Sequence, residues 1–194
     1  MLWLIRDPRA VTASLLKVDW ASNYTYANAY YWLSSARLYL EQWQAEPRIL
    51  RIKYEDLVTA PETQIHQLCQ FIGEAPEPGM MSQRSEKNVP NPHQGGWAKA
   101  HLQQVMQPIG QQSMEKWRSQ LSKTQVAIVE HIARDSMVAH GYEPMTDQLS
   151  PMQERYFNLS QSLDRAEGKF KAFRTRLTGG PSFAAKWVGA TPKQ

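Results

Sequence analysis

The beginning of the chain narrows its possible folds more than any other segment. Met1 to Ile5 form a short continuous apolar run that stops at Arg6, as a buried parallel strand does before a turn. Asp7 is a residue type that caps helices, and Pro8 suits the first helical position. Apolar residues then recur at helical spacing as far as Val18. The segment therefore predicts a buried strand followed directly by a helix of about three turns.

The next sixty residues repeat this alternation of helix and strand. A helix is expected from about Ala27 to Glu46, a second strand within Arg48 to Leu57, and a third helix from Pro61 to a stop at Gly73. Two short parallel strands covered by helices indicate the α/β class. The residues expected to face the core are Ala29, Leu33, Ala36, Leu40 and Trp43 in the long helix, Ile49, Leu50, Ile52, Tyr54 and Leu57 in the strand, and Ile65, Leu68, Cys69 and Ile72 in the third helix.

The second half of the chain begins with a long irregular stretch. Glu74 to Gln112 is rich in Pro, Gly, Asn, Gln and Ser, which predicts a loop over a site or outside the core. Order returns at Met114 to Leu121, and Ser122 with Gln125 forms a capping box for a helix ending near Gly141. A last, charged helix is expected at 150–177, with Tyr156, Leu159, Leu163 and Phe170 on one face. We expect one domain over 1–145 and a helical extension with a basic tail over 146–194.

Composition and charge exclude several classes of protein. A single cysteine, Cys69, rules out an intramolecular disulfide, and the five histidines show no pairing suited to a metal. Six Lys/Arg and no acids lie within 168–194, so the net charge of +4 belongs to the tail. Neither a transmembrane segment nor a signal peptide is evident, so we expect a soluble, cytoplasmic protein. A nucleic-acid or membrane-surface role for the tail is the weaker alternative to a solvated extension, and no nucleic-acid partner is expected.

The turn after the first strand is a candidate anion site. It places Arg6 at the carboxyl end of a strand, beside the positive end of the helix that begins at Pro8. Ser14 lies two turns further on and adds a hydroxyl if a bound phosphate lies along the helix. The alternative is that Arg6 and Asp7 form a local ion pair and that Ser14 is an ordinary helix serine.

Three stretches resemble the sulfotransferases that use 3′-phosphoadenosine 5′-phosphosulfate (PAPS). Ile5-Arg-Asp-Pro-Arg-Ala-Val-Thr-Ala-Ser14 is similar to the family's 3′-phosphate segment, in which an arginine and a serine eight positions later hold the phosphate. Arg51-Ile-Lys-Tyr-Glu-Asp-Leu-Val-Thr-Ala-Pro61 resembles its strand, turn and following helix. Trp117 to Leu121 with Gly141-Tyr142-Glu143 resembles the closing helix. The resemblance implies that Arg6 and Ser14 bind the 3′-phosphate and that Tyr54 lies against the adenine.

The same resemblance implies that parts of a sulfotransferase domain are missing from this sequence. Sulfotransferases begin with a strand and a glycine-containing phosphate loop, whereas the first glycine in this chain is Gly73. The family's catalytic base also lies upstream of the strand at 1–5, so we identify no catalytic residue and no metal ligand. The expected fold is the C-terminal portion of a three-layer, P-loop-type sulfotransferase domain. Its sheet would be incomplete, so we expect a marginally stable or self-associating chain.

The resemblance implies transfer of a sulfuryl group from PAPS, with adenosine 3′,5′-bisphosphate as the product, to a hydroxyl or amine on a small molecule or glycan. We expect the 194-residue chain by itself to be inactive. Lys99 and Arg118 are competing candidates for a third phosphate anchor, against the alternative that both are surface charges. A non-catalytic interaction module that retains part of the fold is the other reading of the function.

Overall fold

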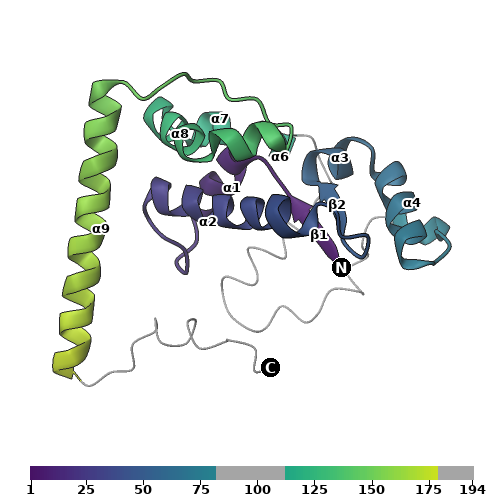
Figure 1. The fold of residues 1–194 in the computed structure, drawn as a ribbon, viewed down its shortest axis with the longest axis horizontal. Coiled ribbons are helices and arrows are strands. Elements are labelled where there is room, and N and C mark those ends of the chain that lie inside the picture. The colour runs from purple at the N-terminus through teal and green to yellow at the C-terminus, as the bar shows by residue number, and fades with distance from the viewer. Residues whose placement is uncertain (82–111, 179–194) are drawn as a thin grey trace.

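The computed structural model describes residues 1–81 and 112–178, and within them the predicted helix-rich α/β fold is confirmed (Figure 1). Strands β1 (Leu2–Ile5) and β2 (Leu50–Lys53) form a two-stranded parallel sheet. The helices are α1 (Pro8–Leu15), α2 (Thr25–Leu38) with a π-helical turn at Tyr39–Trp43, α3 (Tyr54–Thr59), α4 (Pro61–Ile72), α6 (Gln112–Glu115), α7 (Trp117–Gln120), α8 (Lys123–Ala139) and α9 (Pro151–Thr178).

The helix ends follow the capping signals in the sequence. Asp7 accepts a hydrogen bond from the Arg9 backbone N–H at the start of α1, and Pro8 is the first helical residue. Ser122 and Gln125 form the predicted capping box at the start of α8. Gly73 ends α4 with φ at 79°, a conformation that glycine adopts without steric cost. These helix ends depend on side chains and backbone groups within a few residues of one another, so the sequence predicts them well.

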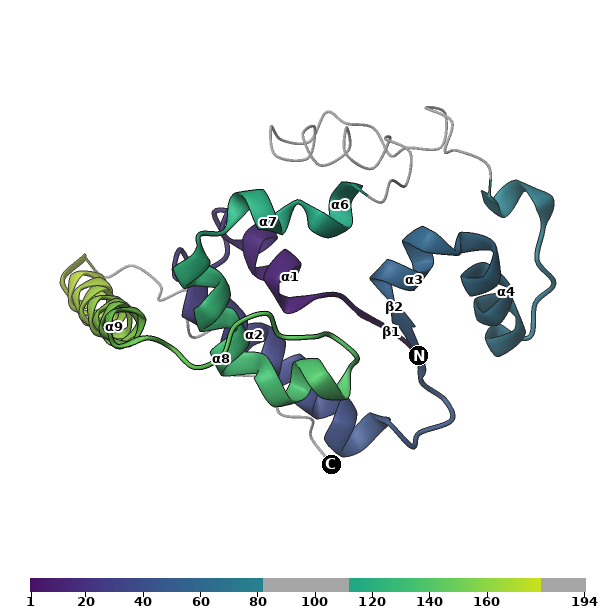
Figure 2. The same ribbon diagram turned by 90° about the horizontal axis from the view of Figure 1, so that it is seen from above.

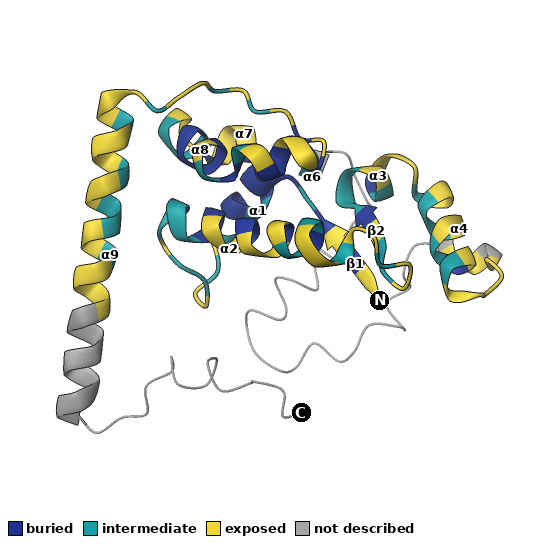
Figure 3. Cartoon of the chain, viewed as in Figure 1, coloured by how far each residue is buried: buried dark blue, intermediate teal, exposed yellow. Residues whose placement is uncertain are grey.

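The sheet is buried on one face in the described part of the chain. Leu2 pairs with Leu50, and the register continues to Ile5 opposite Lys53. Trp3 and Ile5 are buried, whereas Leu2 and Leu4 are 47% and 57% exposed. The prediction of a strand buried throughout was therefore wrong for this face, because successive side chains of a strand point to opposite sides and the described helices pack on only one of them (Figure 3).

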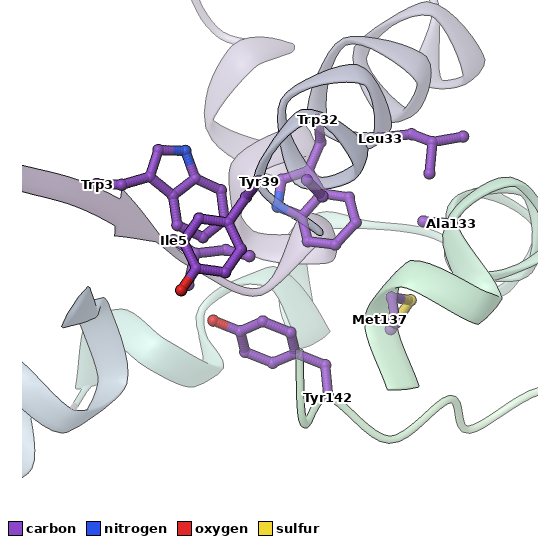
Figure 4. Packing of buried hydrophobic residues seen from close by; sticks show 9 residues of the cluster. Trp3, Ile5, Trp32, Leu33, Tyr39, Ala133, Met137 and Tyr142 are labelled. Carbon is purple, nitrogen blue, oxygen red and sulfur yellow. The ribbon is translucent and has the colours of Figure 1, made fainter. Parts of the chain in front are cut away.

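The main core lies between β1, α2 and α8. Trp3 stacks on Tyr39 with 4.3 Å between ring centroids. Figure 4 shows these two rings facing Tyr142, with Met137 and Ala133 of α8 nearby. Helix α1 closes the cluster from a second side and packs on both α2 and α8. The interior therefore joins residues near the N-terminus to residues of α8 and the turn that follows it.

Three predicted details were wrong. The second strand stops at Lys53, and Tyr54 and Leu57 lie in α3. Ile72 was expected in the core but is 53% exposed at the end of α4. The helix from Pro8 ends at Leu15 rather than near Val18. The apolar residues at 54 and 57 suit either a strand or a helix, and such short runs are ambiguous in sequence.

Helix α9 stands at one side of α2 and α8, away from the sheet, as Figures 1 and 2 both show. The predicted helix is present, with Tyr156, Leu159 and Leu163 exposed. The side chain of Phe170 lies outside the described residues, as does most of the loop predicted over 74–112; of that loop, Pro78–Met81 form a 3₁₀ turn and Gln112 begins α6. Among the helices that the structure describes, none combines the length and apolarity needed to cross a bilayer.

Candidate anion-binding site

The parallel sheet brings Arg6 and Tyr54 together. Ile5 and Lys53 are the last pair of the parallel sheet. The residues that follow them, Arg6 and Tyr54, therefore lie at the same end of the sheet. The guanidinium carbon of Arg6 lies 4.2 Å from the centroid of the Tyr54 ring, within the range of a cation–π contact. Arg6 and Tyr54 are 48 positions apart and each follows a strand. Together they form one surface, in which a guanidinium lies over an aromatic ring.

Three further contacts hold Arg6 in place. The Trp32 indole Nε1 donates a hydrogen bond of 2.8 Å to the Arg6 carbonyl, which holds the backbone just after β1. Arg6 Nη2 donates to the Ser113 carbonyl at 2.6 Å. The hydroxyls of Tyr54 and Ser113 are 2.8 Å apart. Ser113, at the start of α6, is a site residue that the sequence analysis missed, since nothing in its local sequence marks it.

One buried donor of Arg6 has no partner among the described residues. Its Nε is buried and makes no hydrogen bond to the residues that the structure describes. A buried guanidinium N–H normally finds an acceptor, because leaving it unsatisfied costs free energy. Phosphate and carboxylate oxygens are the acceptors whose geometry suits a guanidinium.

The remaining predicted site residue is Ser14. It is on the exposed side of α1, and its hydroxyl makes no hydrogen bond to the described residues. The structure therefore joins Arg6 and Tyr54 directly and leaves the Ser14 hydroxyl open to solvent.

Asp7 pairs with Arg9 rather than with Arg6, so the alternative of a local Arg6–Asp7 ion pair is wrong. Arg9 Nη2 donates to Asp7 Oδ2 at 2.6 Å, and Arg9 Nη1 donates to Glu130 Oε1 at 2.7 Å. The Arg9 guanidinium also lies over the Trp117 ring, 4.3 Å from its centroid. Burial by itself would lower the pKa of Arg9, but the hydrogen bonds and charges of Asp7 and Glu130 outweigh it and raise that pKa.

Glu55 connects the first turn to the end of α8. Its Oε1 accepts from the Asp7 backbone N–H at 3.0 Å, and its Oε2 accepts from the Tyr142 hydroxyl at 2.9 Å. Burial, followed by the nearby Glu55 carboxylate, raises the pKa of Tyr142. The three stretches that carry the sequence resemblance, around residues 6, 55 and 142, therefore meet in one hydrogen-bonded cluster.

Of the two predicted candidates for a third phosphate anchor, the structure describes Arg118 but not Lys99. Lys99 lies outside the described residues. Arg118 forms an exposed ion pair with Glu115 and stacks on Trp117. Lys53, at the end of β2, donates to the Gly141 carbonyl at 3.2 Å and lies over the Tyr142 ring. Arg118 and Lys53 are thus both engaged with the protein's own groups.

The arrangement defines the fold as that of part of a sulfotransferase domain. A sulfotransferase domain from the curacin biosynthetic pathway has the same fold, with a TM-score of 0.54 and 20% sequence identity. The match covers 73% of this chain and 53% of that domain, so the chain spans about half of its length. Residues 1–78 match the model of the family described as "Sulfotransferase family". No curated protein matches the sequence. The predicted resemblance is confirmed: by sequence over residues 1–78, and by fold over most of the chain.

Proposed function

We propose that this chain provides the 3′-phosphate side of the cofactor site in a PAPS-dependent sulfotransferase, which acts on a hydroxyl or amine acceptor. The family match over 1–78 includes Arg6, Ser14 and Tyr54. The observation that carries the proposal is Arg6: a cation held over an aromatic ring, with a buried Nε that lacks a partner among the described residues.

The proposed residues have separate tasks. Arg6 binds a phosphate oxygen through Nε, while its Nη2 stays on the Ser113 carbonyl. Tyr54 supports the guanidinium with its ring and presents an aromatic surface to the adenine. Ser14 is one α-helical turn beyond Ala10 on an exposed face and supplies a hydroxyl to the same phosphate. Together these groups read the 3′-phosphate, which separates this cofactor from adenosine nucleotides that lack it.

These residues position the cofactor and take no part in the chemistry. PAPS supplies the sulfuryl group, and its transfer needs a base for the acceptor proton and cations for the leaving phosphate. We assign neither to this chain. Binding energy at the 3′-phosphate contributes by orientation. The 194-residue chain by itself is therefore expected to bind adenosine 3′,5′-bisphosphate in the millimolar range, about −4 kcal/mol, and to transfer no sulfuryl group.

A titration followed by ¹H–¹⁵N NMR tests the proposal at this affinity. The arginine Nε–Hε signals report directly on the unpartnered donor of Arg6. Adding adenosine 3′,5′-bisphosphate is expected to shift the Arg6 Nε signal and the backbone signals near Tyr54. Adenosine 5′-monophosphate, which lacks the 3′-phosphate, is the matched control and is expected to leave the Arg6 signal in place.

A variant completes the test. Arg6→Ala removes the charge-assisted bond and is expected to weaken binding by about 1.5–3 kcal/mol, which abolishes a detectable titration. Arg118→Ala, on the exposed ion pair with Glu115, is the control. Equal shifts with both nucleotides, or unchanged binding by Arg6→Ala, would contradict the proposed role of Arg6.

A further inference from the structure

Helix α9 carries an apolar stripe that is exposed in the part of the chain that the structure describes. Met152, Tyr156, Leu159 and Leu163 are 81%, 51%, 58% and 51% exposed. Their spacing alternates between four and three residues, and the sequence continues it through Ala166, Phe170, Phe173 and Leu177. We call Met152, Tyr156, Leu159, Leu163 and Ala166, with these continuing positions, the α9 seam.

Contacts on another face of α9 hold the seam away from the body. The Phe157 ring lies against Tyr26 and His131, with centroids 6.0 and 6.1 Å away. The Tyr26 hydroxyl donates to Asp164, and the Tyr24 hydroxyl donates to Glu167 at 2.9 Å. The helix is therefore anchored through residues between those of the seam. Figure 3 shows the outer side of its described part as exposed.

The spacing of the apolar residues in the seam indicates which kind of partner packs against it. Apolar residues spaced alternately by three and four repeat every 3.5 residues, which is the heptad pattern of a coiled coil. An isolated helix that packs on a globular core shows a broader stripe with a period of 3.6. The 28 residues of α9 hold four such heptads over a length of about 42 Å. The partner of the seam is thus another long helix.

Charge along α9 identifies that helix. Residues 151–167 hold three acidic and two basic residues, a net of −1, whereas 168–178 hold four basic residues and no acid. A parallel pair would place both basic ends side by side. An antiparallel pair places each basic end against the other helix's acidic half, and it pairs the seam positions with one another around a centre between Leu163 and Ala166. Such a pair has the two-fold symmetry of most homodimers.

We propose that the chain forms an antiparallel homodimer through the α9 seam. The dimer leaves the cluster around Arg6 and Tyr54 free, because α2 and α8 lie between α9 and the strands that lead into that cluster (Figure 1). Its assembly is accordingly independent of the proposed cofactor site.

The solution mass of the full 194-residue chain is the first test. Sedimentation equilibrium is expected to show twice the 22.3 kDa of one chain. The double variant Leu159→Glu with Leu163→Glu is expected to return it to 22.3 kDa at the same concentration, a loss of at least about tenfold in affinity. Both leucines are exposed in the single chain, so the variant keeps its fold, which circular dichroism checks.

Two control variants distinguish association through the seam from association through another exposed surface. Asn158→Glu adds one negative charge, half of that added by the double variant, to an exposed position of α9 outside the seam and is expected to leave the dimer intact. Leu4→Lys changes the exposed face of β1 and is also expected to leave it intact. A monomeric wild type, or a dimer lost only with Leu4→Lys, would overturn the proposal.

Cross-linking tests the orientation. Met152→Cys and Leu177→Cys are expected to form an intermolecular disulfide only when the two variants are mixed, since an antiparallel pair places these positions together. Cys69 is 1% exposed and does not compete. Efficient cross-linking of Met152→Cys with itself would show a parallel pair and contradict the proposal. So would a wild-type chain that is monomeric but floats with anionic phosphatidylserine vesicles, because the seam would then be a membrane-binding surface.

Discussion

Arg9 and Glu130 form a buried ion pair across 121 residues of sequence. Arg9 Nη1 donates to Glu130 Oε1 at 2.7 Å, and the two side chains are 6% and 0% exposed. Glu130 Oε2 also accepts from the backbone N–H groups of Met145 and Thr146 at 2.9 and 2.7 Å. The pair therefore joins α1, α8 and the segment that leads to α9, directly behind the turn that carries Arg6.

Glu130→Gln is expected to destabilise the chain by about 1.5–3 kcal/mol, because it removes one of the two carboxylates that pair with the buried Arg9 and leaves Asp7 as its charged partner. The amide keeps the size of the side chain and one acceptor oxygen. Urea denaturation followed by circular dichroism measures the change. Glu115→Gln breaks the exposed pair with Arg118 and is the control, with an expected loss below about 1 kcal/mol. Equal losses in the two variants would contradict the buried pair's importance.

Two substitutions of Tyr54 separate its ring from its hydroxyl. Tyr54→Phe keeps the ring under Arg6 and removes the bond to Ser113, so binding of adenosine 3′,5′-bisphosphate is expected to weaken by at most about 1 kcal/mol. Tyr54→Ala removes the cation–π contact as well, and binding is expected to fall further by about 0.5–2 kcal/mol. NMR titration measures both. A larger loss in the Phe variant would assign the main role to the hydroxyl.

His140 is expected to make stability depend on pH. Burial, and next the nearby charges of Arg51 and Lys53, lower the pKa of His140 below its ordinary value of 6.5. Its Nε2 lies 3.2 Å from the Ala36 carbonyl, and its Nδ1 lies 3.4 Å from Arg51 Nη1, which suits the neutral ring. The unfolded chain therefore takes up the proton first, and stability is full above pH 6.5 and falls as the pH drops below it.

Urea midpoints measured at several pH values test this expectation. His140→Gln keeps an N–H donor for Ala36 but cannot titrate, so the slope of stability against pH below 6.5 is expected to flatten relative to the wild type. The absolute stability of the variant does not enter the comparison. An unchanged slope would show that other groups cause the acid sensitivity.

Two glycines are expected to respond oppositely to alanine. Gly141 has φ at +76°, and a Cβ there would lie 3.4 Å from Lys53 Nζ, so Gly141→Ala is expected to cost about 1–2 kcal/mol. Gly168 lies inside α9 with nothing within 4 Å of a built Cβ. Gly168→Ala is expected to stabilise by up to about 1 kcal/mol. Thermal unfolding measures both, and stabilisation by Gly141→Ala would contradict the strain argument.

The exposed face of β1 is expected to promote aggregation. Leu2 and Leu4 are 47% and 57% exposed, next to Met1 at 58%, which forms a contiguous apolar patch on a sheet. Leu4→Lys is expected to reduce light scattering on heating without lowering the unfolding midpoint. Val138→Lys, at a 60% exposed position on α8, is the control and is expected to change neither. Equal scattering in the wild type and the Leu4 variant would exclude the patch as the cause.

Long-range contacts decide the parts of the site that the sequence left open. Arg6 was identified from its place after a strand, but its buried Nε and its bond to Ser113 depend on a segment 107 residues away. Local spacing suggested that Asp7 pairs with Arg6; the structure pairs it with Arg9, because Glu130 and Trp117 hold that guanidinium from the other side. The resemblance placed Ser14 beside Arg6 on the phosphate and Tyr54 on the adenine, whereas the parallel register places Tyr54 directly against Arg6.

The sequence by itself determined what short-range chemistry controls: the strand that ends just before Arg6, the caps at Asp7, Ser122 and Gly73, and the helix at α9 with Tyr156, Leu159 and Leu163 on one face. These features depend on backbone groups and side chains within a few residues of one another. Only the tertiary structure decided that β1 is buried on one face, that Glu55 joins Asp7 to Tyr142, and that Tyr156, Leu159 and Leu163 of α9 are exposed. Each of these features depends on which distant segments pack against one another. That packing is a property of several elements together and not of the residues within a single helix or strand.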